Sequence, residues 1–228
     1  FNGYICNPRI STSARYSGAS FTHLTAPISS DNNTLFLSKF DNAGIFDHSM
    51  KNNLELEGDN RVRTNIKKFG TGSIYFDGND ALQYDSGNAL SFRAGPFTVE
   101  FFVYFIGHAN AGGPNVRASL VRGIGISSGH FVIQRYDGDW RVGTEPSPQI
   151  IVTQNANSET WYHVALTRDS SQDLRLFIDG TQAGSTVQLT QDFTENDFFF
   201  GNLYRTGGST RALTGCLDEI RFTSGVAR

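Results

Sequence analysis

The chain has 228 residues and a net charge of −3, and only 18% of its residues are charged, whereas 24 are glycine and 13% are aromatic. This length fits one large all-β domain or two small domains, and the apolar content argues against disorder. No basic stripe of the kind that a nucleic-acid surface needs is present, and no apolar run approaches the ~18 residues of a membrane helix. The sequence therefore predicts neither a nucleic-acid partner nor insertion into a membrane.

Strand patterns follow one another along the chain, and turn residues end each of them. The dipeptides Asp137-Gly138 and Asp179-Gly180 close two of these patterns, and Asp-Gly accepts the positive φ angles of a type I′ hairpin turn. No segment shows a convincing helical period, so the sequence predicts an all-β fold of antiparallel sheets packed face to face. The clearest expected strands, in chain order, are 73–76, 97–105, 130–136, 161–168, 174–178 and 181–185.

Alternation assigns the side chains of 161–168 to two faces. Odd-numbered residues, beginning with Trp161, share one face, and even-numbered residues share the other. Because both faces carry apolar residues, we expect this strand to lie in the middle of a sheet.

The two cysteines, Cys6 and Cys216, cannot form a disulfide framework or a cysteine-rich zinc site. We interpret them as buried free thiols. A bridge between the two ends of the chain is the alternative.

The two ends of the chain resemble each other. Gly3 aligns with Gly215, Arg9 with Arg221 and Ile10 with Phe222, at an offset of 212 residues. A repeat at the length of a whole domain is typical of tandem arrays. The alternative is a chance similarity between two amphipathic strands that each follow a glycine.

This repeat predicts how the chain is divided. We expect residues 1–16 to be the terminal strand of a preceding repeat, 17–33 to be a linker and 34–228 to be one complete domain. The linker contains Pro27 and a polar run, both typical of exposed connections. In this interpretation the chain is a window from a longer array.

Several of these segments resemble the laminin-G-like branch of the concanavalin A-like lectin/glucanase superfamily. The segment FTVEFFV at 97–103 is similar to a family strand in which Phe102 stands where tryptophan is usual, and WYHVALTR at 161–168 is similar to the family's closing signature. Further matches lie at 35–41, 68–78, 174–180 and 215–228. The resemblance implies a jelly-roll β-sandwich, of a type found in tandem in large phage and bacterial surface proteins.

The resemblance does not extend to the catalytic pattern of the superfamily's glycanases. Those enzymes carry E-x-D-x-E or a bulged variant on one strand, because two carboxylates about 5 Å apart must flank the scissile bond in a retaining enzyme. Asp137-Gly138-Asp139 fits a turn, and Asp218 and Glu219 point to opposite faces of a regular strand. We therefore predict no catalytic residues and no enzymatic activity.

Related jelly rolls hold a calcium ion through acidic residues near the first and last strands, and oxygen ligands suit this cation. On this resemblance the candidate ligands are Asp41, Asp47 and Asp218, and calcium would have a structural role. The alternative is that these carboxylates cap turns, since aspartate accepts backbone N–H bonds at strand ends.

A sugar-binding site would combine an aromatic ring with polar groups for the hydroxyls. Trp140 is the candidate ring, because Asp137, Asp139, Arg135 and Arg141 surround it in the sequence. The alternative is that Trp140 packs at the edge of the sandwich. Trp161 belongs to the family's strand signature, so we assign it to the core and to no ligand.

The sequence thus predicts a non-catalytic adhesion or structural module of a larger virion protein, such as a tail fibre or appendage, or of a cell-surface protein. Its expected partners are glycans or other host-surface components, together with neighbouring copies or subunits, and its expected place is the virion surface or the cell exterior. The alternative is a glycoside hydrolase or lyase of the same fold, or an ancillary carbohydrate-binding domain of such an enzyme.

Overall fold

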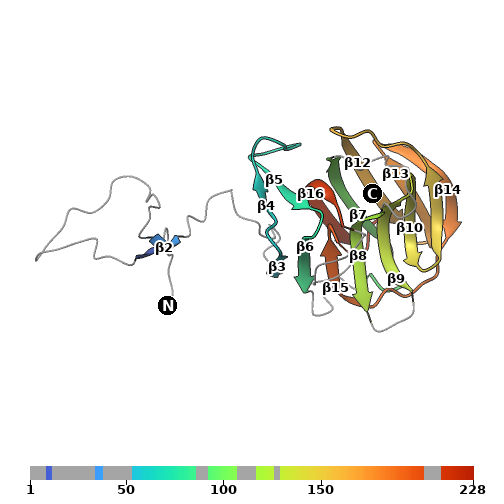
Figure 1. The fold of residues 1–228 in the computed structure, drawn as a ribbon. Coiled ribbons are helices and arrows are strands. Elements are labelled where there is room, and N and C mark those ends of the chain that lie inside the picture. The colour runs from blue at the N-terminus through green and yellow to red at the C-terminus, as the bar shows by residue number, and fades with distance from the viewer. Residues whose placement is uncertain are drawn as a thin grey trace, which may run out of the picture. The chain divides into compact units, whose positions relative to one another are not determined.

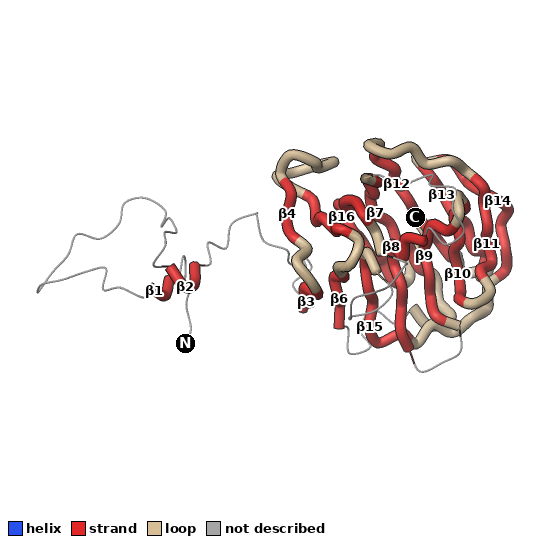
Figure 2. The backbone as a smooth tube through the Cα atoms, viewed as in Figure 1, coloured by secondary structure: helices blue, strands red, loops and turns tan. Residues whose placement is uncertain are grey.

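A computed structural model gives the fold (Figure 1). It describes residues 9–11, 34–37, 53–85, 92–106, 117–125, 129–202 and 212–228. The described residues form strands, turns and loops, as Figure 2 shows, and none of them lies in a helix that is long and apolar enough to cross a membrane. The chain divides into two compact units, Phe1–Gly44 and Ile45–Arg228.

The first unit contains two short strands, β1 (Arg9–Ser11) and β2 (Thr34–Leu37). They pair antiparallel, with Arg9 opposite Leu37 and Ile10 opposite Phe36.

A strand does begin at Thr34, and it pairs with β1. The second compact unit begins at Ile45. The predicted start of the complete domain at residue 34 stays a prediction. The assignment of residues 1–16 to a preceding repeat, and of 17–33 to a linker, stays a prediction.

The second unit consists of two seven-stranded antiparallel sheets, which we call the β8 sheet and the β7 sheet after their middle strands. In order across the β8 sheet, the strands are β11 (Pro148–Thr153), β10 (Asp139–Glu145), β9 (His130–Tyr136), β8 (Arg117–Gly125), β15 (Glu195–Phe200), β6 (Ala81–Asp85) and β3 (Asn53–Glu57). In order across the β7 sheet, they are β14 (Thr181–Gln188), β13 (Asp173–Ile178), β12 (Trp161–Arg168), β7 (Phe97–Phe105), β16 (Thr214–Ser224), β5 (Ser73–Asp77) and β4 (Arg61–Arg63). The predicted antiparallel β-sandwich is confirmed.

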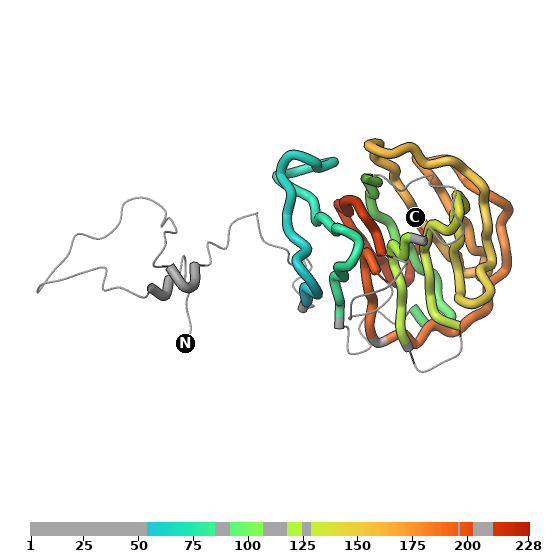
Figure 3. The backbone as a smooth tube through the Cα atoms, in the orientation of Figure 1, coloured from blue at the N-terminus to red at the C-terminus, as the bar shows by residue number. Residues whose placement is uncertain are grey.

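Segments far apart in the sequence are neighbours in the β7 sheet. The C-terminal strand β16 lies between β7 and β5, so that in Figure 3 the red end of the chain runs beside green and teal segments. Strand β12 lies between β7 and β13, in agreement with its predicted inner position. The β7 sheet therefore joins elements from both ends of the second unit.

The two predicted Asp-Gly turns have the expected backbone. Asp137 and Gly138 have φ angles of 50° and 88°, and Asp179 and Gly180 have φ angles of 50° and 78°. These values lie in the left-handed region that such a turn requires. The first turn joins β9 to β10, and the second joins β13 to β14.

The core lies between the two sheets and follows the strand alternation. In β7 the residues that face the core are Phe97, Val99, Phe101, Val103 and Phe105, and each is at most 3% exposed. Each fully buried side chain of this kind contributes about 1.5–3 kcal/mol. The residues between them, Thr98, Glu100, Phe102 and Tyr104, point away from the core.

Cys216 is a buried free thiol, as predicted, and burial raises its pKa. Cys6 lies outside the described residues.

Candidate functional site

Trp140 does not offer a ring to solvent. It is 1% exposed, belongs to the core between the sheets, and its ring lies 6.2 Å from that of Phe105. The turn ends at Gly138, so β10 is already a regular strand at residue 140, and alternation places Trp140 on the core side together with Val142. The prediction of Trp140 as a sugar-stacking platform is therefore corrected: the packing alternative describes this side chain.

The polar residues predicted beside Trp140 separate into two groups. Arg135 is 4% exposed on the core side, where its guanidinium lies 4.7 Å from the centre of the Trp140 ring and donates to the carbonyl of Gln154 at 2.9 Å. Burial lowers the pKa of Arg135 to about 10, although the charge of Asp139 opposes this shift.

Asp139 and Arg141 point to the other side of the β8 sheet. Their side chains form an ion pair at 3.2 Å, and Asp139 also accepts the hydroxyl of Thr153 at 2.7 Å. Asp137 is a turn residue. The five predicted ligand-binding residues therefore do not form one surface.

Asp218, the predicted calcium ligand on the last strand, accepts hydrogen bonds from three backbone N–H groups. Its Oδ2 accepts the N–H groups of Lys68 and Phe69 at 2.8 and 3.1 Å, and its Oδ1 accepts that of Glu219 at 2.9 Å. It thus ties the loop before β5 to β16. Asp41 and Asp47 lie outside the described residues, so the calcium site stays a prediction.

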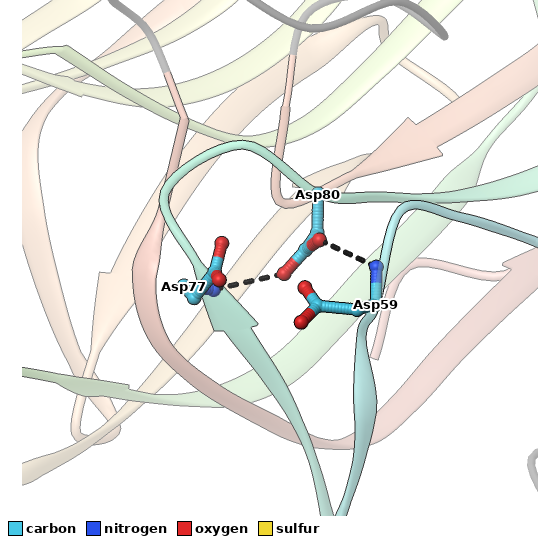
Figure 4. A group of neighbouring side chains, drawn as sticks. All are labelled: Asp59, Asp77 and Asp80. Carbon is cyan, nitrogen blue, oxygen red and sulfur yellow. Dashed lines mark hydrogen bonds between the residues drawn. The ribbon is translucent and has the colours of Figure 1, made fainter.

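A different acidic cluster is formed by Asp59, Asp77 and Asp80, whose carboxylates point toward one another (Figure 4). One oxygen of each lies within 4.8 Å of the others. Asp80 is fully buried and accepts the backbone N–H groups of Asp59 and Asp77, each at 2.9 Å. Burial raises its pKa. The position of Asp80 is explained by a structural role, because its carboxylate joins the turn at Asp59 to the turn that follows β5.

Four half-buried side chains with aromatic rings lie together on the outward side of the β7 sheet. Strands β7 and β12 pair so that Trp161 lies opposite Tyr104, and His163 lies opposite Phe102. The ring centres are 5.3 Å apart in the first pair and 4.7 Å apart in the second. All four side chains are partly exposed. We call these four residues, together with Phe69, the aromatic face.

Phe69 extends the aromatic face from the loop that Asp218 holds. The residue is 51% exposed, and its ring meets that of Phe102 edge-on at 5.3 Å. The ammonium of Lys68 lies 5.3 Å from the centre of the Phe102 ring. The hydrogen bonds that the N–H groups of this loop donate to Asp218 therefore position one aromatic ring and one cation beside the sheet.

Polar groups border the aromatic face. Glu100 lies between its neighbours on β16 and β12, where it accepts Arg221 Nε at 2.7 Å and lies 3.5 Å from His163 Nε2. Desolvation raises the pKa of Tyr104 above its usual value. The phenolic hydroxyl of a tyrosine can both donate and accept a hydrogen bond. Rings with adjacent donors and acceptors suit a ligand that has both apolar C–H surfaces and hydroxyl groups.

Sequence reasoning assigned Trp161 to the core and so missed this face. The sequence did contain one indication. The odd-numbered residues of 97–105 are all apolar, whereas the charged Glu100 is one of the residues between them. That charge marks the outward side of β7, and the pairing with β12 places Trp161 and His163 on the same side.

Comparisons with known proteins agree with the fold. Residues 76–227 match the laminin G family model described as concanavalin A-like lectin/glucanases superfamily. A search of curated proteins gave no match.

Among solved structures, the chain is similar to domain 4 of AbnA, a GH43 extracellular arabinanase from Geobacillus stearothermophilus, in complex with arabinotriose. The identity is 16%, the TM-score is 0.58, and the match covers 75% of this chain and 82% of that one.

The chain is also similar to the binding domains of two toxins. The binding domain of Paraclostridial Mosquitocidal Protein 1 has 16% identity and a TM-score of 0.62, with 82% of this chain and 48% of that chain covered. The ligand-binding domain of botulinum neurotoxin serotype D, in complex with N-acetylneuraminic acid, has 12% identity and a TM-score of 0.60, with 80% and 45% covered. This chain thus spans less than half of either toxin domain, and these likenesses show a shared fold.

Proposed function

Since the chain belongs to the concanavalin A-like lectin/glucanases superfamily, we propose that it is a non-catalytic glycan-binding module whose ligand lies on the aromatic face. The observation that carries this proposal is the register of β7 and β12, which sets Trp161 beside Tyr104 and His163 beside Phe102 on one partly exposed surface. Pyranose and furanose rings present C–H faces that pack on such rings, while their hydroxyls take hydrogen bonds from the bordering side chains.

The structural neighbours support glycans as the class of ligand. Domain 4 of the arabinanase is described in complex with arabinotriose, and the neurotoxin domain in complex with N-acetylneuraminic acid. Both are sugars with several hydroxyl groups, one neutral and one anionic.

The polar contacts on the aromatic face favour binding over hydrolysis. Retaining glycosidases need a second carboxylate about 5 Å from the first, and inverting ones need it farther away with a water between. Glu100 is engaged by Arg221 and His163, and Asp218 accepts three backbone N–H groups. Both carboxylates therefore have structural roles, which favours a binding module over a hydrolase.

We further propose that the module serves adhesion or assembly in a larger virion or cell-surface protein, outside the cell. The second candidate function is that of an ancillary carbohydrate-binding domain of a glycan-degrading enzyme. The similarity to domain 4 of an arabinanase favours this candidate. In both cases the module itself binds and does not cleave.

A glycan array that includes arabino-oligosaccharides and sialylated glycans tests the proposal, with any ligand then titrated by calorimetry. We expect Trp161→Ala to weaken binding at least about 10-fold, which corresponds to 1.4 kcal/mol. Trp140→Phe is the matched control. The Trp140 ring lies in the core, so this substitution should leave the affinity unchanged. An array without a ligand, or equal losses in the two variants, would contradict the proposal.

Incubation with each bound oligosaccharide tests the absence of catalysis. Chromatography of the mixture should return the oligosaccharide intact, whereas shorter products would show a hydrolase or lyase.

A further inference from the structure

A bulge in strand β16 determines which of its side chains reach the outward side of the β7 sheet. Asp218 lies opposite Phe102 of β7, whereas Arg221 lies opposite Glu100, so three steps along β16 match two steps along β7. Glu219, inside this irregular stretch, has a φ of 51°. In a regular strand Asp218 and Arg221 would point to opposite sides, and the extra residue instead turns Arg221 to the outward side.

Arg221 presents its guanidinium at the border of the aromatic face. The residue is exposed, and its Nε and Nη2 contact the same oxygen of Glu100, at 2.7 and 2.6 Å. The other oxygen of Glu100 lies 3.5 Å from His163 Nε2. A guanidinium has five N–H donors, and the contacts with Glu100 use only Nε and Nη2, so Nη1 can donate to a second anion.

Lys68 places a second cation on the same side of the sheet. The residue is exposed, and its ammonium lies 5.8 Å from the ring centre of Phe69 and 5.3 Å from that of Phe102. Its backbone N–H donates to Asp218 at 2.8 Å. The backbone of Lys68 is therefore fixed to β16 while its ammonium lies beside two rings of the aromatic face.

The two cations lie beside neighbouring positions of β7. The first cation contacts Glu100 and the second lies beside Phe102. Glu100 and Phe102 are successive outward residues, about 7 Å apart along the strand. The carboxylates of Glu100 and Asp218 are both engaged, the first by ion pairs and the second by three backbone N–H groups. A sugar that packs on the Phe102 ring therefore lies within reach of two cations.

Acidic side chains border the aromatic face on its β12 side. Asp179, in the turn after β13, accepts the backbone N–H of His163 at 2.8 Å. Glu159 precedes β12, and its charge adds to the effect of desolvation in raising the pKa of Tyr104. Both carboxylates belong to exposed residues. An anionic group of a ligand is therefore attracted toward the β16 side of the face and repelled from the β12 side.

We propose that the ligand of the aromatic face is an acidic glycan, an inference that rests on the proposed glycan-binding function. The carboxylate of a uronic or sialic acid lies between Lys68 and Arg221, and an adjoining neutral sugar packs on Trp161. Arginine binds a carboxylate with directed N–H bonds, whereas lysine adds a point charge on a flexible stem. The charge difference between the two sides of the face thus sets the direction in which the glycan lies.

A glycan array built from matched pairs tests the class of ligand. Each pair holds an oligosaccharide with a uronic or sialic acid and its carboxyl-reduced form, in which a primary alcohol replaces the carboxylate. We expect the acidic member to bind at least about 10-fold more tightly, as hydrogen bonds to charged groups allow. Equal binding within the pairs, or a preference for sulfated glycans that have no carboxylate, would overturn the inference.

The same array separates this inference from the proposed function. Neutral glycans that bind as well as acidic ones, and that Trp161→Ala weakens, would overturn the acidic ligand and leave the proposed function in place. An array on which no glycan binds would overturn the proposed function and the acidic ligand together.

Two adjacent lysines provide a matched pair of variants. Lys68→Gln should weaken binding of the acidic member about 10-fold and leave binding of its reduced form unchanged. Lys67→Gln is the control, because it changes the net charge equally, but the Lys67 ammonium donates to the carbonyl of Thr64 at 2.9 Å. The control should lose about 2-fold or less, since exposed charges at a distance are screened. Equal losses measured by calorimetry in the two variants would show a general charge effect and would overturn the inference.

Discussion

Each of the two sheets carries a tryptophan and an arginine, and their orientations relative to the core are opposite in the two sheets. In β9 and β10, Trp140 and Arg135 face the core and are at most 4% exposed. In the β7 sheet, Trp161 of β12 faces away from the core, and Arg221 of β16 lies outward with 56% of its side chain exposed. The residue types are similar, but their position relative to the core is reversed.

This comparison teaches that residue type alone does not define a binding surface in a β-sandwich. A shift of one residue moves a side chain from one face of a strand to the other. Trp140 has aspartate and arginine neighbours in the sequence, yet it stabilises the core. Trp161 lies in a strand typical of the fold, yet it belongs to the aromatic face.

The largest expected effect separates the two tryptophans by stability. Trp140→Ala should lower the free energy of unfolding by about 3–5 kcal/mol, because it leaves a cavity among core side chains. Trp161→Ala should lower it by about 1 kcal/mol, since its ring is only partly buried. Urea denaturation followed by circular dichroism measures both. Equal losses of unfolding free energy in the two variants would contradict the different burial of the two tryptophans.

The next effect concerns the loop that extends the aromatic face. Asp218→Ala should cost about 2–3 kcal/mol, because three backbone N–H groups lose a charged acceptor. Asp218→Asn keeps one carbonyl oxygen as an acceptor and should cost less. Thermal melts in EDTA and in calcium chloride should give the same loss. A loss that appears only with calcium would assign Asp218 to a metal instead.

Glu195 is a buried carboxylate, and its burial makes the stability of the fold depend on pH. It is 3% exposed, and burial raises its pKa above the usual 4.5, although the N–H of Phe131 opposes the shift. A raised pKa in the folded state gives a stability contribution that is complete below the unfolded pKa and is lost as the pH rises through the folded pKa.

Glu195→Gln has no such titration. Relative to the original chain, this variant should gain stability as the pH rises through the same window. Melting temperatures measured from about pH 4 to about pH 8 test this. A constant difference between the two chains over that range would contradict a raised pKa for Glu195.

The smallest effect belongs to the exposed arginine that borders the aromatic face. Arg221→Ala removes an ion pair with Glu100 and should cost about 1 kcal/mol or less, because exposed pairs contribute little. The loss should shrink further in high salt, which screens such pairs. A large loss that salt does not change would show that Arg221 has a packing role.

Much of the fold could be predicted from the sequence. Strands β7, β12 and β13 carry long apolar or alternating patterns, and the Asp-Gly turns carry their own backbone requirement. Strand β10 was missed because Asp137-Gly138-Asp139 was interpreted as a turn. The turn needs only its first two residues, and the strand begins at Asp139.

Less of the candidate site could be predicted. Alternation grouped Trp161 with His163 correctly, but a strand with apolar residues on both faces does not show which face is inward until its neighbours are known. Asp59, Asp77 and Asp80 come together only through the pairing of β5 with its neighbours and the turns around it. The role of Asp218 depends on backbone groups about 150 residues away in the sequence, which no side-chain pattern reveals.

The aromatic face is tested most directly by the two indole N–H resonances of the ¹⁵N-labelled chain during titration with a glycan that binds on the array. Trp140→Phe and Trp161→Phe assign the two signals. A ligand on the aromatic face should shift the Trp161 signal progressively and leave that of Trp140 in place. A bound glycan that leaves the Trp161 signal unmoved would contradict the assignment of the ligand to this face.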